Sequence, residues 1–376
     1  MMNLEKSPAF RQSGQAIFLT GVTGALGKEI VKAALTGGDA KLFLLVRRKN
    51  RFSHWDRARK ILESCGLESS LGTRVQVMEG DITLPGLGLS AADIEILRRE
   101  VTLFHHIAAL TALNANEEES VRVNLRGTEE VLALAADLWR AGRLQRFFYF
   151  STAYVSGSLQ TYHAYEDQLT ERPAHANYYE SSKYEAEKRV RSAMRNGFPA
   201  TIFRPSIVVG DSRTGEVSEF NVIYPFMKLF AHGILSQLPT RPENTFNIVP
   251  IDFVVQATMA IAGQKDSIGK TFHLVTQEPP SIGMLLQMKE EEYPDMPDVE
   301  MIPPEDFKKE GLDPMQQTVY EMLAPYLGYL NGRLTFDTAN TEKFLKGTGI
   351  SFPRTDHAFL KTLCQYAFDA GYLIRQ

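Results

Sequence analysis

One segment of this chain places a tyrosine and a lysine at a spacing suited to proton transfer. Tyr179 and Lys183 stand four residues apart where the pattern predicts the start of a helix. Residues four apart share one helical face, so the ammonium would lower the pKa of the phenol. Such a tyrosine passes a proton at neutral pH to an oxygen that gains negative charge. The spacing also arises by chance in a chain with 14 tyrosines, so it predicts acid–base chemistry only together with other signals.

A second copy of the same spacing follows directly, from Tyr184 to Lys188. Five residues rotate a helix position by roughly 140°, so both copies cannot face one site. The first copy is nearer the helix start, among small residues that let a ligand approach. The residues around the second copy are typical of a solvated face: Glu185, Glu187, Lys188 and Arg189. We therefore predict that Tyr179 and Lys183 form the functional pair.

Two hydroxyls follow the apolar run from Phe147 to Phe150, at Ser151 and Thr152. A hydroxyl at the carboxyl end of a strand can hydrogen-bond an oxygen that reacts there. Hydroxyls at strand ends also commonly cap turns, and that alternative remains open.

Three glycines spaced three apart, Gly21, Gly24 and Gly27, follow an apolar strand and precede a helical stretch. A second strand over 41–46 completes a βαβ unit of about 30 residues. Such a loop turns sharply, approaches a pyrophosphate closely and aims a helix N-terminus at its charge. The pattern predicts a dinucleotide site, with a purely structural glycine turn as the alternative.

The tip of the second strand carries cations, Arg47-Arg48-Lys49, and no carboxylate. A carboxylate there would bind the ribose 2′-hydroxyl of NAD, whereas a guanidinium favours the 2′-phosphate of NADP. We predict NADPH as the cofactor. A solvated basic strand end is the alternative.

Composition limits the remaining classes. The chain has 376 residues, 44% of them hydrophobic, and a net charge of −4, with no clustered basic patch that predicts nucleic-acid binding. Two distant cysteines, Cys65 and Cys364, and the absence of ligand-type spacings predict no metal site and fit a reducing cytoplasm. No signal peptide or apolar run of membrane-spanning length is evident, so we expect a cytoplasmic protein without an integral membrane segment.

Strand and helix patterns alternate up to Gly210, with further strands expected over 74–82, 101–109, 146–155 and 199–209. This alternation predicts an α/β fold with a doubly wound parallel sheet. A long helix is expected over 116–141. We predict a nucleotide-binding domain over 1–210, with returns to the sheet near 246–276, and a smaller, mostly helical substrate lobe over 211–376 that includes an apolar helix over 220–235.

Several motifs together resemble the extended short-chain dehydrogenase/reductases, in matching order and spacing. They are Thr20-Gly21-x-x-Gly24-x-x-Gly27, Gly80-Asp81-Ile82, His106-x-Ala108-Ala109, Asn124-x-x-Gly127-Thr128, Ser151-Thr152-Ala153, Tyr179-x-x-x-Lys183 and Arg204-Pro205-Ser206. Within that superfamily, Leu44 to Arg47, Gly80 to Thr83 with Leu87 to Ser90, Arg204 to Glu216 and Asn247 to Phe253 resemble the thioester reductases, which include fatty acyl reductases and terminal reductase domains. The resemblance covers residues 15–275.

The resemblance implies a role for each matching residue. Thr152, Tyr179 and Lys183 would form the catalytic triad, with Asn124 as a supporting member. Arg47 would meet the 2′-phosphate of NADPH. The other cofactor contacts it implies are Gly21, Thr23, Gly24, Ala25, Leu26 and Gly27 at the pyrophosphate, Asp81 and Ile82 at the adenine, Ala108 and Ala109 along the nucleotide, and Pro205, Ser206 and Ile207 at the nicotinamide.

The implied reaction is NADPH-dependent reduction of an acyl thioester, on coenzyme A or an acyl carrier protein, to an aldehyde. A second reduction to the alcohol stays open. The chain carries no adenylation or carrier segment, so the acyl donor would be a separate molecule. A ketone or sterol-type dehydrogenase and a nucleotide-sugar epimerase share the triad and stay open. A redox-sensing scaffold with a degenerate site is disfavoured, because the triad is intact. His105 and His106 depart from many relatives, and we expect them to be satisfied partners at a strand end.

Overall fold

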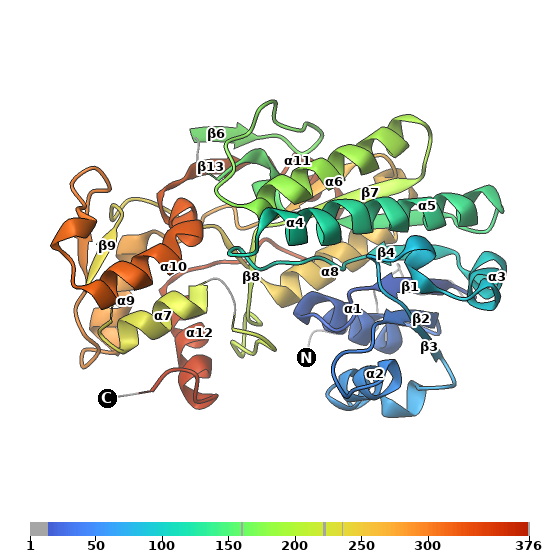
Figure 1. Ribbon diagram of the computed structural model, residues 1–376, viewed down its shortest axis with the longest axis horizontal. Helices are drawn as coiled ribbons and strands as arrows, with labels where there is room; N and C mark the ends of the chain where they lie inside the picture. The colour runs from blue at the N-terminus through green and yellow to red at the C-terminus, as the bar shows by residue number, and fades with distance from the viewer. Residues whose placement is uncertain (1–13, 159–160, 221–222, 235, 375–376) are drawn as a thin grey trace.

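The computed structural model describes residues 14–158, 161–220, 223–234 and 236–374 (Figure 1). Its centre is a seven-stranded sheet in the order β11-β7-β5-β4-β1-β2-β3, in which every neighbouring pair is parallel. The strands are β1 (Ala16–Thr20), β2 (Lys41–Val46), β3 (Val75–Glu79), β4 (Leu103–His106), β5 (Arg146–Phe150), β7 (Ala200–Pro205) and β11 (Thr271–Leu274). The predicted doubly wound parallel sheet is therefore confirmed.

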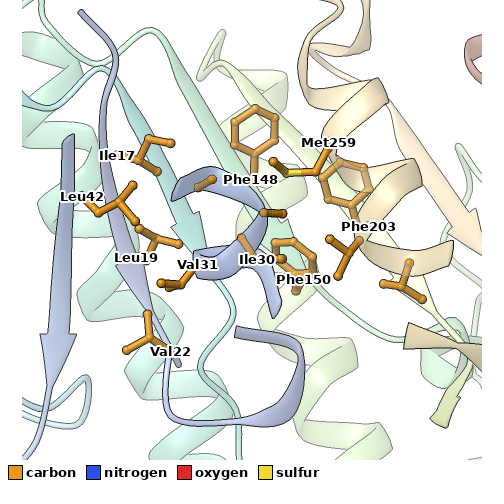
Figure 2. Packing of buried hydrophobic residues seen from close by; sticks show 14 of the residues in the cluster. Ile17, Leu19, Val22, Ile30, Val31, Leu42, Phe148, Phe150, Phe203 and Met259 are labelled. Carbon is orange, nitrogen blue, oxygen red and sulfur yellow. The ribbon is translucent and has the colours of Figure 1, made fainter. Parts of the chain in front are cut away.

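Helices cover both faces of this sheet because successive strand residues point to opposite sides. On one face, Ile17 and Leu19 of β1 pack with Phe148 and Phe150 of β5 (Figure 2). On the other face, Phe18 lies 4.8 Å from Phe104, ring centre to ring centre. The first face packs against α1 (Ala25–Thr36), α2 (His54–Glu63), α8 (Ile251–Ala262) and α11 (Ala339–Leu345), and the second against α3 (Ala91–Glu100), α5 (Gly127–Arg140) and α6 (Tyr178–Arg195).

The long helix expected over 116–141 is present but is not uniform. It begins as α4 (Glu117–Ser120), passes through a π-helical segment over Val121–Arg126, and continues as α5. A π-helical turn shifts the residues on either side relative to an α-helix and is frequent at functional sites. Here it carries Asn124, one of the predicted site residues.

A second lobe lies beside the carboxyl edge of the sheet, at the left of Figure 1. Its own apolar cluster is separate from the two that flank the central sheet. The helices that build it are α7 (Ile223–Ala231), α9 (Ile282–Glu292), α10 (Pro314–Asn331) and α12 (His357–Asp369). Two short parallel pairs connect it to the first body: β6 (Thr161–Ala164) with β13 (Arg333–Phe336), and β8 (Ile207–Val209) with β10 (Ile248–Pro250). A third short pair, β9 (Gln237–Pro239) with β12 (Glu300–Ile302), lies within the second lobe.

The chain crosses between the two bodies more than once. As expected, β11 returns to the central sheet, where it pairs with β7. The strand near residue 248 was also expected in the central sheet, but β10 pairs with β8 outside that sheet. Helix α8, which follows β10, packs on one face of the central sheet. Helix α11 does the same, with Phe344 and Leu345 buried in the sheet's cluster. Residues 339–345 therefore pack with the nucleotide-binding body, although they lie inside the range predicted for the second lobe.

Candidate active site

The three glycines of the loop after β1 meet three different physical demands. Gly21 has φ +79°, and a Cβ there would lie 2.3 Å from the backbone nitrogen of Ala108. A Cβ on Gly27 would lie 2.2 Å from the carbonyl oxygen of Gly21, so helix α1 packs directly on the loop. At Gly24 the nearest atom to a Cβ is 3.6 Å away. Close packing therefore requires glycine at positions 21 and 27. At position 24 the space next to the backbone is open, so a ligand can approach the loop there.

Helix α1 begins just after Gly24, which gives it no side-chain cap. The amide groups of its first turn, at Ala25, Leu26 and Gly27, are therefore available at the positive end of the helix dipole. Thr23 is exposed beside them. An uncapped N-terminus behind an open glycine fits a pyrophosphate, so the residues present suit a dinucleotide.

Arg47 lies exposed at the carboxyl end of β2, with its Nη1 3.6 Å from the Oδ2 of Asp81. The Oδ1 of Asp81 accepts hydrogen bonds from the backbone and hydroxyl of Thr83, both at 2.9 Å. Ile82 is buried against Gly127 at the start of α5. Arg57 of α2 donates to the carbonyl oxygen of Arg47 at 2.6 Å. No local signal in the sequence marks Arg57, because its position next to Arg47 depends on how α2 packs against β2.

Tyr179, Thr152 and Lys183 come together at the carboxyl ends of β5 and β7. Helix α6 begins at Tyr178 after Asn177, whose side chain accepts from the backbone of Glu180. The hydroxyl of Tyr179 lies near the side chain of Thr152, which acts to lower its pKa. Lys183 is buried, and its Nζ donates to the carbonyl oxygen of Phe150 at 2.7 Å. The structure thus brings the two hydroxyls and the ammonium to one strand edge.

The protonation of this pair differs from the sequence expectation. Burial raises the pKa of Tyr179 to about 12, although the side chain of Thr152 acts in the opposite direction. Burial lowers the pKa of Lys183 to about 7, and the negative charge of Glu187 opposes that shift. The expected lowering of the tyrosine pKa is therefore wrong, because the loss of hydration outweighs the interaction that lowers it.

The second Tyr-x-x-x-Lys copy points elsewhere, as predicted. The Tyr184 hydroxyl donates to the carbonyl oxygen of Thr170 at 3.1 Å, and Lys188 is exposed and pairs with Glu185. The expectation for Glu187 is wrong: its side chain is 0% exposed and lies between two arginines. Because those arginines come from distant parts of the fold or the next helical turn, the local sequence gave no sign of the burial.

Asn124 is buried in the π-helical segment and is fully hydrogen-bonded. Its Oδ1 accepts from the backbone of Leu110 at 2.8 Å, and its Nδ2 donates to the carbonyl oxygen of Leu110 and to the Oγ of Ser182, both at 3.0 Å. Ser182 immediately precedes Lys183. The contacts of Asn124 in this structure therefore join the loop after β4 to α6.

The two histidines of β4 differ. His106 accepts at Nδ1 from Thr20 at 2.8 Å and donates at Nε2 to Thr128 at 3.1 Å, because the hydroxyl of Thr128 is itself committed to the carbonyl oxygen of Asn124. That histidine is the satisfied partner that we expected. His105 is also buried, but neither ring nitrogen has a hydrogen-bond partner in the described part of the chain, and burial lowers its pKa to about 3. For His105 the expectation is wrong.

The predicted nicotinamide contacts lie together after β7. The carbonyl oxygen of Pro205 accepts from the Thr152 hydroxyl at 3.5 Å. The hydroxyl of Ser206 is buried and has no hydrogen-bond partner among the described residues. An orphaned buried hydroxyl beside Thr152 fits a site that a ligand completes. Ala108 and Ala109 lie half-buried after β4, where Ala108 faces Gly21.

An apolar cavity in the second lobe begins next to these residues. Ile207, directly after Ser206, forms part of its wall with Phe226 of α7 and Tyr329 of α10. The Tyr329 hydroxyl accepts from Asn177, which caps α6 just before Tyr179, at 3.1 Å. Cys364 also lines the cavity, and burial raises the pKa of its thiol to about 12. The wall is almost wholly aliphatic and aromatic, so the cavity suits a hydrocarbon group.

The described part of the chain contains no cluster of three or more His, Cys, Asp or Glu side chains placed to hold a metal ion. Across the same residues, no helix combines the length and the hydropathy that crossing a bilayer requires.

The sheet order, the glycine loop and the Tyr-Lys helix define an oxidoreductase of the extended short-chain dehydrogenase/reductase type with a Rossmann nucleotide-binding body. Within this class the chain belongs to the NAD-binding family described as male sterility protein, whose model matches residues 19–258.

Relatives named as a peptide synthetase and as a fatty acyl-CoA reductase are similar over most of the chain. The nonribosomal peptide synthetase asaC of Aspergillus flavus is 27% identical over 92% of this chain, and the fatty acyl-CoA reductase wat of Drosophila melanogaster is 26% identical over 66%. This chain spans only 36% of the first and 54% of the second, and a quarter or less of two further peptide synthetases.

Among solved structures, the terminal reductase domain from the myxalamid biosynthetic pathway is similar over almost its whole length. Its TM-score is 0.82 with 28% identity, and the match covers 97% of this chain and 94% of that domain. The similarity therefore includes the second lobe as well as the Rossmann body.

Proposed function

We propose that this protein reduces acyl thioesters to aldehydes with NADPH as the hydride donor. The observation that carries the proposal is an apolar cavity whose wall includes Ile207, two residues after Pro205, whose carbonyl oxygen accepts from the Thr152 hydroxyl. A thioester carbonyl at the hydroxyls would place its acyl chain in the cavity. The names of similar proteins, which include terminal reductase domains and a fatty acyl-CoA reductase, support the same reaction class.

In this mechanism the chain's own residues stabilise charge and supply a proton. NADPH supplies the hydride when bound. Thr152 and Tyr179 donate hydrogen bonds to the carbonyl oxygen as it becomes negative, and Tyr179, protonated at neutral pH, gives up its proton. Lys183 provides a positive charge behind the tyrosine. The resulting hemithioacetal collapses to aldehyde and free thiol.

No acyl-enzyme on cysteine is part of the proposal. A thiolate nucleophile needs a lowered pKa, whereas burial raises the pKa of both Cys65 and Cys364. Hydride transfer to the thioester itself needs no such nucleophile.

The proposal has three linked parts: NADPH is the cofactor, thioesters of coenzyme A or of a carrier protein are the substrates, and the site residues have the roles given above. The deciding experiment follows NADPH oxidation with a panel of acyl-coenzyme A thioesters, carrier-bound thioesters, free aldehydes, ketones and nucleotide sugars, with products identified by mass spectrometry. We expect aldehyde from the thioesters, and alcohol if a second reduction follows. If the protein turns over a ketone or a nucleotide sugar but forms no product from any thioester, the proposed substrate class is wrong. The protein would then be a ketone dehydrogenase or a nucleotide-sugar epimerase.

A further inference from the structure

Glu187 is a fully buried carboxylate for which the reaction scheme has no use so far. Arg204 donates to it from Nε at 3.1 Å and from Nη2 at 2.6 Å, and Arg191 donates from Nε at 2.7 Å. A fourth donor is the Ser151 hydroxyl at 2.6 Å. The two guanidiniums hold the pKa of Glu187 far below its usual range, so this carboxylate remains charged.

The partners of Glu187 are next to active-site residues on three segments. Ser151 precedes Thr152 at the end of β5, and Arg204 precedes Pro205 at the end of β7. Glu187 itself follows Lys183 by one helical turn of α6. These segments also contact one another, since Thr152 donates to the carbonyl oxygen of Pro205 at 3.5 Å.

Several titratable groups surround Lys183. Among those described below, Glu187 is the one that carries a negative charge at neutral pH. The ring of Tyr149, from β5, lies 4.4 Å from the Lys183 Nζ. His106, from β4, is held neutral by burial, which lowers its pKa well below the usual range. On α6 itself, Tyr179 is uncharged at neutral pH, and Glu187 opposes the effect of burial on the lysine.

We propose that Glu187 is a positioning residue of the active site: it fixes the ends of β5 and β7 against α6, and its negative charge acts on the Lys183 ammonium. Glu187 lies one turn of α6 beyond Lys183, and the two side chains bond to the consecutive residues Ser151 and Phe150. The kinetic part of this inference rests on the proposed function, whereas the charge on Lys183 can be measured in the cofactor-free protein. The two can therefore fail separately.

The direct test measures the titration of Lys183 in protein carrying ¹³C-labelled lysine, with the resonance assigned by its loss in Lys183→Arg. We expect Glu187→Gln to lower the titration midpoint by about one pH unit or more, because the ammonium loses its counter-charge. Glu185→Gln is the matched control, since Glu185 lies two residues away but pairs with the exposed Lys188. An unchanged midpoint in folded Glu187→Gln would overturn the inference.

The kinetic test compares pH profiles of kcat. In Glu187→Gln we expect kcat at pH 7 to fall on the order of tenfold and its alkaline limb to move to lower pH. An equal loss at every pH, with the limb unmoved, would mean that Glu187 only supports the fold. Ser151→Ala removes one hydrogen bond but keeps the charge, so it should lower kcat without moving the Lys183 titration.

Glu187→Gln leaves two buried arginines without their carboxylate and can prevent folding. The double variant Glu187→Gln with Arg191→Gln removes one negative and one positive group together, so the formal charge of the cluster is unchanged. It is judged by the same titration: a lowered midpoint supports the inference, and an unchanged midpoint contradicts it. If the wild type oxidises no NADPH with any thioester, the proposed function fails while this measurement still decides the role of Glu187.

Discussion

At the scale of single residues, α6 offers an internal control because it carries two tyrosines followed by lysines four residues later. Only Tyr179 reaches Thr152, whereas the Tyr184 hydroxyl is bonded to Thr170. We expect Tyr179→Phe to lower kcat by about 100-fold or more, because the proton donor is lost. Tyr184→Phe should leave kcat nearly unchanged. Steady-state kinetics of both variants check this, and the reverse pattern would reassign the proton donor.

Arg47 is expected to select the cofactor. Its guanidinium is exposed at the end of β2, where it can bind a 2′-phosphate, the group that distinguishes NADPH from NADH. Arg47→Ala should raise the KM for NADPH on the order of tenfold and leave the KM for NADH nearly unchanged. Arg48→Ala is the control, because Arg48 is exposed next to it but pairs with Glu79. Equal losses with both cofactors would refute the assignment.

The pH dependence of the reaction follows from the pKa values of Tyr179 and Lys183. Tyr179, with a pKa raised to about 12, stays protonated throughout the neutral range and should impose no limb there. Lys183, with its pKa lowered to about 7, loses its proton as the pH rises through that value. We therefore expect kcat/KM for thioester reduction to fall as the pH rises above about 7. Initial rates between pH 6 and pH 9 measure this, and a flat profile would show that the charge on Lys183 is not needed.

At the scale of elements, two glycines beside α1 have different expected roles: Gly27 in packing and Gly24 in cofactor binding. An Ala at position 27 would place its Cβ 2.2 Å from the Gly21 carbonyl oxygen, whereas at position 24 the nearest contact is 3.6 Å. Gly27→Ala should therefore destabilise the fold, seen as a lower thermal midpoint. Gly24→Ala should keep the midpoint but weaken NADPH binding several-fold, because the methyl group occupies the space left for the pyrophosphate. Fluorescence titration with NADPH measures the second effect. If Gly24→Ala binds NADPH normally, the loop is not part of the cofactor site.

At the scale of the whole molecule, the apolar cavity lies where α7, α9, α10 and α12 meet the strand that begins at Ile207. Each methylene buried there contributes about 0.8 kcal/mol, so kcat/KM should rise roughly three- to fourfold per CH₂ until the cavity is filled. Phe226→Ser should flatten this dependence. Phe359→Ser is the matched control, because Phe359 is buried in the same cluster outside the cavity wall and should affect stability alone. Equal rates for acetyl and long-chain thioesters would contradict an acyl site here.

The local sequence was sufficient where the physical cause is itself local. The glycine spacing, the alternation of apolar runs with helices and the Tyr179-to-Lys183 spacing predicted the parallel sheet, the loop and the helix that carries the pair. These features depend on backbone conformation and on residues that are close together in the sequence. Helical geometry likewise indicated that Tyr179 and Tyr184 cannot face one site, and the small residues near the helix start favoured Tyr179.

Only the tertiary structure decided which groups lose their water. Glu187 has the sequence surroundings of a solvated face, yet Arg204, 17 residues further on, folds against it in the interior. The pKa values of Tyr179 and Lys183 are set by burial beneath elements that come from distant parts of the chain. The cavity likewise needs residues from 207 to 364. Burial and long-range pairing are properties of the assembled fold, so the sequence alone determined the chemistry available here, and the fold determined its charge state and surroundings.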